Sequence, residues 1–353
     1  MRVVDVKLGT IKAELKKPFI TNLRKVNEIE DVCLTMICDN GVIGYGEAPP
    51  TVAITGEDIA SINDTIATKI FPAIKDIDIE NESDIFGALH SSVGKSTSAK
   101  ACVDMALYDA LSKSQNLPLY EYLGGTKRVL QTNLTISLND INTMLDDSVA
   151  AYNEGFRILK IKVGKDVDDA VSAIELIRQS LPEALLRVDA NQAWSEMESL
   201  KVIERIAKCN IELLEQPVRF DDIRAMKNIT ARSQIPILAD ESVFSYDDAV
   251  RLIDEKACDY INIKLMKSGG IHEAMKIVRL AKASGTKVMM GSMLESVISI
   301  SAGVHLSMVD EIISFFDLDG IYLSKPSSIK NSLRLLSDTI SLDCAGGLGI
   351  ELS

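Results

Sequence analysis

The chain has 353 residues, a hydrophobic fraction of 46% and a charged fraction of 25%, which are typical of a globular protein with ample core. Its formal net charge of −13 argues against non-specific nucleic-acid binding, because that activity needs a basic surface to displace phosphate counterions. Charges interleaved from the first residues, apolar stretches too short for a membrane span and six scattered cysteines without a Cys-x-x-Cys pair lead us to expect a cytoplasmic protein with no membrane partner.

The first 125 residues predict an α+β unit. Val3 to Leu15 and Asp31 to Cys38 alternate like strands, and residues 39–41, Asp-Asn-Gly, supply a hairpin turn before a third apolar run. Three helical stretches follow, at roughly 57–75, 82–90 and 97–115. We therefore expect residues 1–125 to form a separate domain.

Eight short apolar runs then recur, and the positions that close them lie 24 to 27 residues apart, a fit length for one strand, one helix and two loops. The closing residues are Thr135, Lys162, Asp189, Glu215, Asp240, Lys264, Gly291 and Asp317. Eight such units predict an α/β fold with a (β/α)₈ barrel over residues 126–320, with its chemistry at the C-terminal ends of the strands. The repeat stops after Gly320, and we expect the tail, 321–353, to return to the N-terminal unit.

Three carboxylates close consecutive strands of the predicted barrel: Asp189, Glu215 and Asp240. Neighbouring strands lie about 4.8 Å apart, so these side chains can converge on one cation. Oxygen ligands of this kind suit Mg²⁺. Clustered carboxylates without a counter-ion disfavour their own charge, which makes a bound cation the physical explanation.

Two lysines flank this predicted metal site. Lys162 closes the second strand and Lys264 the sixth, so they lie on opposite sides of the barrel. Lys160 points the same way as Lys162, because residues two apart on a strand share a face. A substrate held between Lys162 and Lys264 would present its two faces to two amines, which predicts a metal site with two bases.

The order of the strand-end motifs resembles the enolase superfamily, in its muconate-lactonizing subgroup, over essentially the whole chain. The motifs are ILKIKV, RVDANQAW, LLEQP, ILADE and INIKLMKSGG. The segments GVIGYGEAPP and GLGIEL are similar to the capping domain of that superfamily. The resemblance implies an enolase-type barrel whose mouth is covered by an N-terminal α+β capping domain, completed by the C-terminal tail.

The resemblance also implies the roles of the site residues. One Mg²⁺ per subunit would be held by Asp189, Glu215 and Asp240. Lys162 and Lys264 would exchange protons with the two faces of a substrate α-carbon, and Lys160 would tune Lys162. Asn191 and Glu241 would orient the metal ligands.

Two further segments resemble parts of enzymes that catalyse one particular reaction of this superfamily. Asp317 and Asp319, in FFDLDG, are similar to the Asp-x-Asp of dipeptide epimerases, where the pair binds the substrate ammonium. FITNLRKVNE resembles the mobile lid of the L-Ala-D/L-Glu epimerases, which implies that Arg24 pairs with a glutamyl γ-carboxylate. The expected further contacts to the peptide or its pocket are Phe19, Ile54, Thr135, Ser292, Met293 and Leu294.

The leading hypothesis is an isomerase, and the family resemblance implies a place in cell-wall peptide metabolism. It would epimerise a dipeptide, L-Ala-D/L-Glu, by two-base 1,1-proton transfer at the C-terminal residue's α-carbon through an enediolate. An o-succinylbenzoate synthase or an N-acylamino acid racemase on the same scaffold stays an alternative. A non-catalytic barrel is disfavoured, because ligand binding does not need two opposed amines. The sequence leaves a homo-oligomer open.

Overall fold

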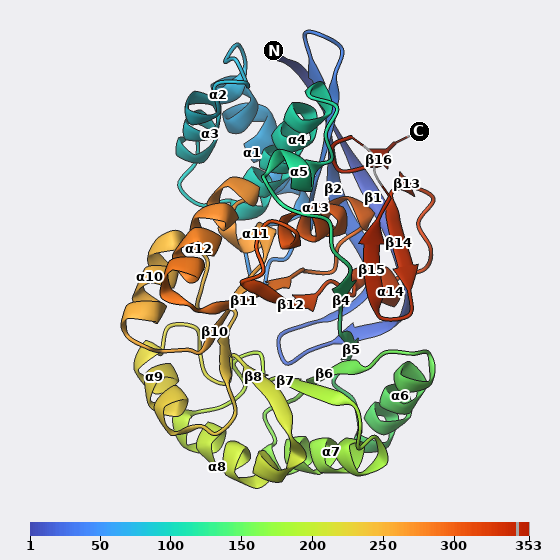
Figure 1. Cartoon of the computed structure of the whole chain (residues 1–353), viewed down its shortest axis with the longest axis vertical. Coiled ribbons are helices and arrows are strands. Elements are labelled where there is room, and N and C mark those ends of the chain that lie inside the picture. The colour runs from blue at the N-terminus through green and yellow to red at the C-terminus, as the bar shows by residue number, and fades with distance from the viewer. Residues whose placement is uncertain (344–345, 353) are drawn as a thin grey trace.

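The barrel is built from eight parallel strands, and each strand after the first is hydrogen-bonded to the barrel strand that precedes it in the chain. In this computed structural model, which describes residues 1–343 and 346–352, helices surround the strands (Figure 1). The strands are β5 (Leu134–Ile136), β6 (Ile158–Lys162), β7 (Leu185–Asp189), β8 (Ile211–Glu215), β9 (Ile237–Ala239), β10 (Tyr260–Ile263), β11 (Lys287–Gly291) and β12 (Ile313–Asp317). A hydrogen bond of 3.3 Å from Asn133 N to Phe316 O links the first and last strands, so the predicted barrel fold is confirmed.

Most helices between and after the strands bury one apolar side against the barrel, and several begin at a side-chain cap. Ser195, for example, accepts a hydrogen bond from Glu198 N while Glu198 accepts from Ser195 N, which satisfies two otherwise unpaired donors. The elements are α6 (Ile141–Asn153), α7 (Val167–Ser180), α8 (Glu196–Ile206), η2 (Ala207–Cys209), α9 (Ile223–Arg232), α10 (Tyr246–Asp254), α11 (Leu265–Ser268), α12 (Ile271–Ser284), α13 (Val297–Ser307) and α14 (Gly320–Leu323).

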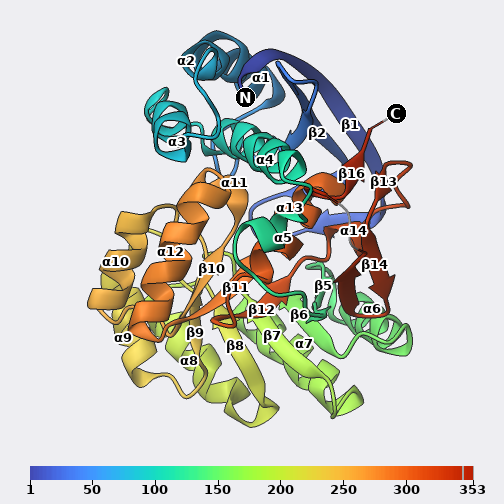
Figure 2. The same cartoon turned by 45° about the horizontal axis from the view of Figure 1, so that its top comes forward.

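The N-terminal part combines an antiparallel sheet with helices that pack beside it. The sheet contains β1 (Val3–Ile20), β2 (Lys25–Cys38) and β3 (Ile43–Ala48). The helices are α1 (Ile59–Thr65), η1 (Ile66–Ile70), α2 (Phe71–Ile74), α3 (Glu82–Ser91), α4 (Thr97–Ser114) and α5 (Leu119–Tyr122). Figure 2 shows α4 between this sheet and the barrel, where it packs against β3 on one side and α11 and α12 on the other.

The close approach of α4 to β3 explains two glycines of the motif GVIGYGEA. A Cβ atom at Gly44 would lie 2.1 Å from the carbonyl oxygen of Ala106, and one at Gly46 would lie 1.9 Å from that of Cys102. Such distances are far inside van der Waals contact, so neither position accepts a side chain unless the helix moves away. The glycines therefore determine how closely the helix that joins the two parts can sit.

The first two strands are longer than the sequence predicts. The predicted strands end at Leu15 and begin at Asp31, whereas β1 runs to Ile20 and β2 starts at Lys25. The added residues pair with one another, Phe19 with Val26 and Ile20 with Lys25. Cross-strand pairing satisfies the backbone of this ribbon without an apolar alternation, so the pattern alone does not reveal it. The segment expected as a lid is therefore the end of a β-hairpin.

The tail supplies short strands at two places. β14 (Leu333–Leu336) and β15 (Thr339–Leu342) form a sheet with β4 (Leu130–Gln131), so only the second half of the first predicted barrel run enters the barrel. β13 (Lys330–Asn331) pairs with β16 (Ile350–Glu351), and Gly347 O accepts a hydrogen bond from Leu119 N. Ala345 and Ser353 of the expected closing segment lie outside the described residues. No helix in the described part of the chain is long and apolar enough to cross a membrane.

Candidate active site

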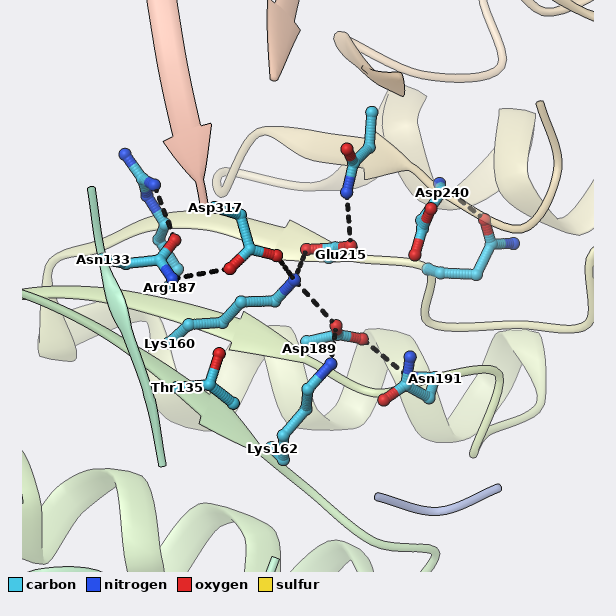
Figure 3. A network of polar contacts seen from close by, with 12 residues as sticks. Asn133, Thr135, Lys160, Lys162, Arg187, Asp189, Asn191, Glu215, Asp240 and Asp317 are labelled. Atoms are coloured by element: carbon cyan, nitrogen blue, oxygen red, sulfur yellow. Dashed lines mark hydrogen bonds and ion pairs between the residues drawn. The ribbon is translucent and has the colours of Figure 1, made fainter. Parts of the chain in front are cut away.

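Buried carboxylates gather at the C-terminal ends of neighbouring barrel strands. Asp189 and Glu215 are the last residues of β7 and β8 and face each other in the parallel register, and Asp240 directly follows β9. All three are at most 1% exposed. Figure 3 shows their side chains turned toward one region inside the barrel mouth, where the predicted metal ligands therefore meet.

The Lys160 ammonium lies among these carboxylates. Its Nζ atom is 2.7 Å from Glu215 Oε2 and 2.7 Å from Asp317 Oδ2. The same atom lies 3.1 Å from Asp189 Oδ2. Although burial disfavours its charge, the surrounding carboxylates, Asp317 foremost, hold the pKa of Lys160 well above its usual value. Lys160 therefore stays charged in this arrangement.

Lys162 and Lys264 each contact one carboxylate from opposite sides of the barrel, because β6 and β10 are four strands apart in a ring of eight. Lys162 Nζ lies 2.5 Å from Asp189 Oδ2, and Lys264 Nζ lies 2.7 Å from Asp240 Oδ2. Burial opposes the charge of Lys264, but Asp240 outweighs it and raises the lysine's pKa. The two predicted bases thus approach the carboxylate cluster from two directions.

The cluster has the chemistry of a site for a divalent cation. Glu215 Oε2 is buried without a hydrogen-bond donor of good geometry, and burial together with Asp189 raises the pKa of Glu215 to about 8. The site is therefore short of positive charge. Among the described residues no group of three or more ligating side chains is arranged to hold a metal as it stands, since Lys160 lies between the carboxylates. The donor set still fits Mg²⁺, because all three side chains are buried oxygen donors at adjacent strand ends.

Side chains two positions before the strand ends form a layer beneath the site. Four of them are apolar and pack together: Leu213, Leu238, Met289 and Phe315. The other four are polar and support the site: Asn133, Lys160, Arg187 and Asn262. Asn262 Nδ2 donates to Glu215 Oε1 at 2.9 Å, and Arg187 Nη1 donates to Asn133 Oδ1 at 2.9 Å. The strand alternation that singles out Lys160 was also the signal that could have found Asn133, Arg187 and Asn262.

A further lysine that the sequence reasoning missed supports Asp240. Lys267, on α11, is 1% exposed, and its Nζ lies 2.5 Å from Asp240 Oδ1. Although burial acts in the opposite direction, Lys264 and Lys267 hold the pKa of Asp240 well below its usual value. Lys267 lies within the motif INIKLMKSGG, but it follows the strand, where alternation no longer predicts direction.

The two aspartates at the end of β12, its last residue Asp317 and the following Asp319, have different surroundings. Asp317 accepts hydrogen bonds from Lys160 and, at 2.7 Å, from Asn133 Nδ2. Asp319 accepts from the backbone N–H of Thr135 at 2.6 Å. Burial and the nearby Asp317 raise the pKa of Asp319 to about 6. Both carboxylates are buried and face the same cavity.

The cavity over the cluster has a volume of about 60 Å³. Asn191 and Glu241, at its edge, are joined by a 3.1 Å hydrogen bond, and Asn191 N donates to Asp189 Oδ1 at 2.9 Å. Burial and Asp240 raise the pKa of Glu241 to about 7. The predicted residues that line the cavity are Phe19, Arg24, Ile54, Thr135, Lys162, Asn191, Asp240, Glu241, Lys264, Ser292, Met293, Leu294, Asp317 and Asp319, whereas Lys160, Asp189 and Glu215 do not line it.

Arg24 reaches this cavity from the hairpin between β1 and β2. Its Nη1 lies 3.4 Å from Thr51 Oγ1. Burial lowers the pKa of the guanidinium, and the nearby Asp31 opposes that effect. Thr21 and Leu23, which the sequence reasoning did not single out, also line the cavity.

Family models match both parts of the chain. Residues 4–124 match the mandelate racemase / muconate lactonizing enzyme N-terminal domain, and residues 144–353 match the enolase C-terminal domain-like family. The chain belongs to the enolase superfamily. The motif order and the barrel with its N-terminal domain lead to the same assignment.

Within the enolase superfamily, the chain is similar to several named epimerases over nearly its whole length. It is 41% identical to the L-Ala-D/L-Glu epimerase of Clostridium acetobutylicum over 99% of both chains. The substrate-liganded structure of the Bacillus subtilis L-Ala-D/L-Glu epimerase matches with a TM-score of 0.97 at 38% identity, covering 99% of both chains. The Enterococcus faecalis dipeptide epimerase, complexed with Mg and L-Leu-L-Tyr, matches with a TM-score of 0.96 at 34% identity, covering 100% of both chains.

Proposed function

We propose that this protein is a Mg²⁺-dependent dipeptide epimerase that acts on L-Ala-D/L-Glu. The observation that carries the proposal is the placement of Lys162 and Lys264 on opposite sides of one cavity above buried carboxylates. Two opposed amines suit a reaction in which a proton leaves one face of a carbon and another arrives on the opposite face. The similarity to named epimerases over nearly the whole chain supports the same reaction.

Asp189, Glu215 and Asp240 would hold one Mg²⁺. When bound, the ion would polarise the carboxylate of the C-terminal residue and make its α-proton more acidic. Asn191 would orient Asp189 through its backbone N–H and would keep Glu241 beside the ligands. Lys160 would balance the negative charge of the cluster from below and tune the neighbouring Lys162.

The proton transfer would use the two lysines in opposite states. One of them, as a neutral amine, takes the α-proton and becomes an ammonium, and the substrate becomes an enediolate. The other, already an ammonium, gives a proton to the opposite face of the same carbon and becomes neutral. The configuration inverts, and the reverse reaction exchanges the roles of Lys162 and Lys264.

The two ends of the dipeptide would be read by different parts of the protein. Asp317 and Asp319 would bind the α-ammonium of the N-terminal residue, a contact that a substrate without an ammonium, such as an N-acylamino acid, cannot make. Arg24 would pair with the γ-carboxylate of the glutamyl side chain, a contact suited to guanidinium geometry. Thr135 and the segment 292–294 would line the peptide between these two groups.

The cavity between the hairpin and the barrel mouth is narrow, with a volume of about 60 Å³. We propose that the end of the β1–β2 hairpin moves outward to admit the substrate. We assign residues 1–125 to the capping domain, 126–320 to the barrel and 321–353 to a segment that completes the capping domain.

The test follows the glutamyl α-proton by NMR. The protein, with Mg²⁺ and L-Ala-L-Glu in D₂O, is expected to remove that signal and produce the L-Ala-D-Glu diastereomer carrying deuterium. Retention of the α-proton during inversion would exclude the two-base scheme. Absence of any exchange with L-Ala-L-Glu or other dipeptides would refute the proposed activity, and turnover of a succinylbenzoate precursor would assign the alternative lyase reaction.

A further inference from the structure

Lys267 is among the largest fully buried side chains described in the chain. Its ammonium donates to three acceptors: Asp240 Oδ1 at 2.5 Å, the backbone oxygen of Asp240 at 2.5 Å and the backbone oxygen of Asn262 at 2.9 Å. An ammonium has three N–H groups. These bonds therefore use the full donor capacity of Lys267, and its position is determined by β9 and β10 together.

The contacts of Lys267 lead directly to Lys264. Lys267 binds one oxygen of Asp240, and Lys264 binds the other, Oδ2, at 2.7 Å. The backbone N–H of Lys267 also donates to the carbonyl of Lys264 at 2.9 Å, across one turn. Lys267 donates hydrogen bonds to both the side chain and the backbone of Asp240. These bonds restrict rotation of the carboxylate and keep its second oxygen directed toward Lys264.

Asp240 is contacted by two ammonium groups, those of Lys264 and Lys267. A second buried ammonium carries a large cost of desolvation, and burial lowers the pKa of Lys267. On the opposite side, Asp189 also contacts two lysines, Lys162 and Lys160. Lys160 Nζ contacts Glu215 and Asp317 as well, whereas the described ion pairs of Lys267 involve Asp240 alone. Among the described residues, Lys160 is thus shared by three carboxylates, whereas Lys267 is dedicated to Asp240, the carboxylate that Lys264 contacts.

We propose that Lys267 is a positioning residue for Lys264: it holds Asp240 so that this carboxylate places the Lys264 ammonium at the face of the substrate α-carbon. Lys267 does not line the cavity, so it would not touch a substrate bound there. The inference rests on the proposed function, because it assumes that Lys264 serves one face of the carbon and Lys162 the other. It predicts a defect confined to one of the two proton transfers.

The experiment uses Lys267→Met, which keeps the length of the apolar stem but removes the ammonium. Loss of the α-proton signal in D₂O is measured separately from L-Ala-L-Glu and from L-Ala-D-Glu, together with inversion in each direction. Lys113→Met is the matched control, because Lys113 lies 2.7 Å from the buried Asp109 on α4, remote from the barrel mouth. Circular dichroism and thermal unfolding establish that each variant folds.

We expect inversion to fall at least tenfold in both directions in Lys267→Met, because every inversion uses both lysines. Exchange without inversion should stay near the wild-type rate for the epimer that Lys162 deprotonates. It should fall at least tenfold for the other epimer. The control variant should show neither change.

An equal loss of exchange from both epimers, or no loss, would overturn the inference, because a merely structural role affects both faces alike. Lys267→Gln is the second variant, since it keeps a donor without the charge. If Lys267→Met and Lys267→Gln both fail to fold while Lys113→Met folds, Lys267 serves the fold rather than the site. Absence of exchange in the wild-type protein would instead refute the proposed function itself.

Discussion

The barrel mouth and the β1–β2 hairpin meet at one cavity, but they are held in place to very different degrees. At the barrel mouth, Lys160 lies within 3.1 Å of three carboxylates. At the hairpin, the Arg24 guanidinium has one hydrogen bond within the described residues, at 3.4 Å to Thr51. Several ion pairs therefore hold the side chains at the barrel mouth. The Arg24 guanidinium, which is proposed to select the substrate side chain, is held by a single hydrogen bond among the described residues.

The difference follows from what surrounds each region. The strands from β6 to β11 are paired with a neighbour on each side, so the ends of these strands are restrained by adjacent strands. The hairpin is a two-stranded ribbon whose residues Lys25, Asn27 and Glu28 are exposed. Regions with few buried contacts open at low free energy. Substitutions at the barrel mouth should therefore abolish turnover, and substitutions in the hairpin should change the choice of substrate.

The largest effect is expected from Lys264→Ala. Without an amine on one face of the α-carbon, inversion should fall by about a thousandfold or more, since one general acid or base contributes about 10²- to 10⁴-fold. The kcat for L-Ala-L-Glu epimerisation measures this change, and the thermal unfolding temperature serves as the control for folding. Inversion within tenfold of wild type in a folded variant would contradict the role of Lys264.

Asp319→Asn should reduce kcat/KM for the dipeptide by about 10- to 150-fold. A hydrogen bond to a charged group contributes about 1.5–3 kcal/mol, and the variant removes the charge that would pair with the substrate ammonium. The steady-state rates of wild type and variant provide the comparison. An unchanged kcat/KM would mean that the ammonium is bound elsewhere. The same substitution at the exposed Asp221 is the control.

Arg24→Met should lower kcat/KM for L-Ala-L-Glu by about tenfold, which corresponds to about 1.4 kcal/mol. Turnover of a dipeptide with a neutral C-terminal side chain should change by less than threefold, because only the γ-carboxylate would pair with the guanidinium. The ratio of the two kcat/KM values is the measurement. An equal loss for both dipeptides would assign Arg24 to the fold of the hairpin rather than to selectivity.

The smallest effect is expected from a change of pH. The kcat/KM value should change little near neutral pH and should decrease clearly in acid. The pKa of Asp319 is raised to about 6, so the carboxylate is charged above that pH and protonated below it. Binding of the substrate ammonium should weaken as the pH falls through 6, and kcat/KM should decrease about tenfold per pH unit below it. A rate profile that stays level from pH 7 to pH 5 would show that Asp319 keeps its charge.

The sequence by itself determined the barrel and the ends of its strands. The repeat of 24 to 27 residues identifies each βα unit, and the alternation along a strand places Lys160 and Lys162 on one face. Both signals are local, because strand and helix periods depend on the backbone within one element. Parallel neighbours align their C-terminal ends, so adjacent strand-end residues meet whatever the details of packing.

Only the tertiary structure decided which side chains support the site and where the hairpin ends. Lys267 reaches Asp240 from a helix after the next strand, and Arg24 reaches Thr51 from the β1–β2 hairpin. No periodic pattern in the sequence predicts either contact, because each depends on how separate segments of the chain pack together. The hairpin likewise extends to Ile20 and Lys25 because its two strands pair with each other, and pairing between segments leaves no local pattern to read.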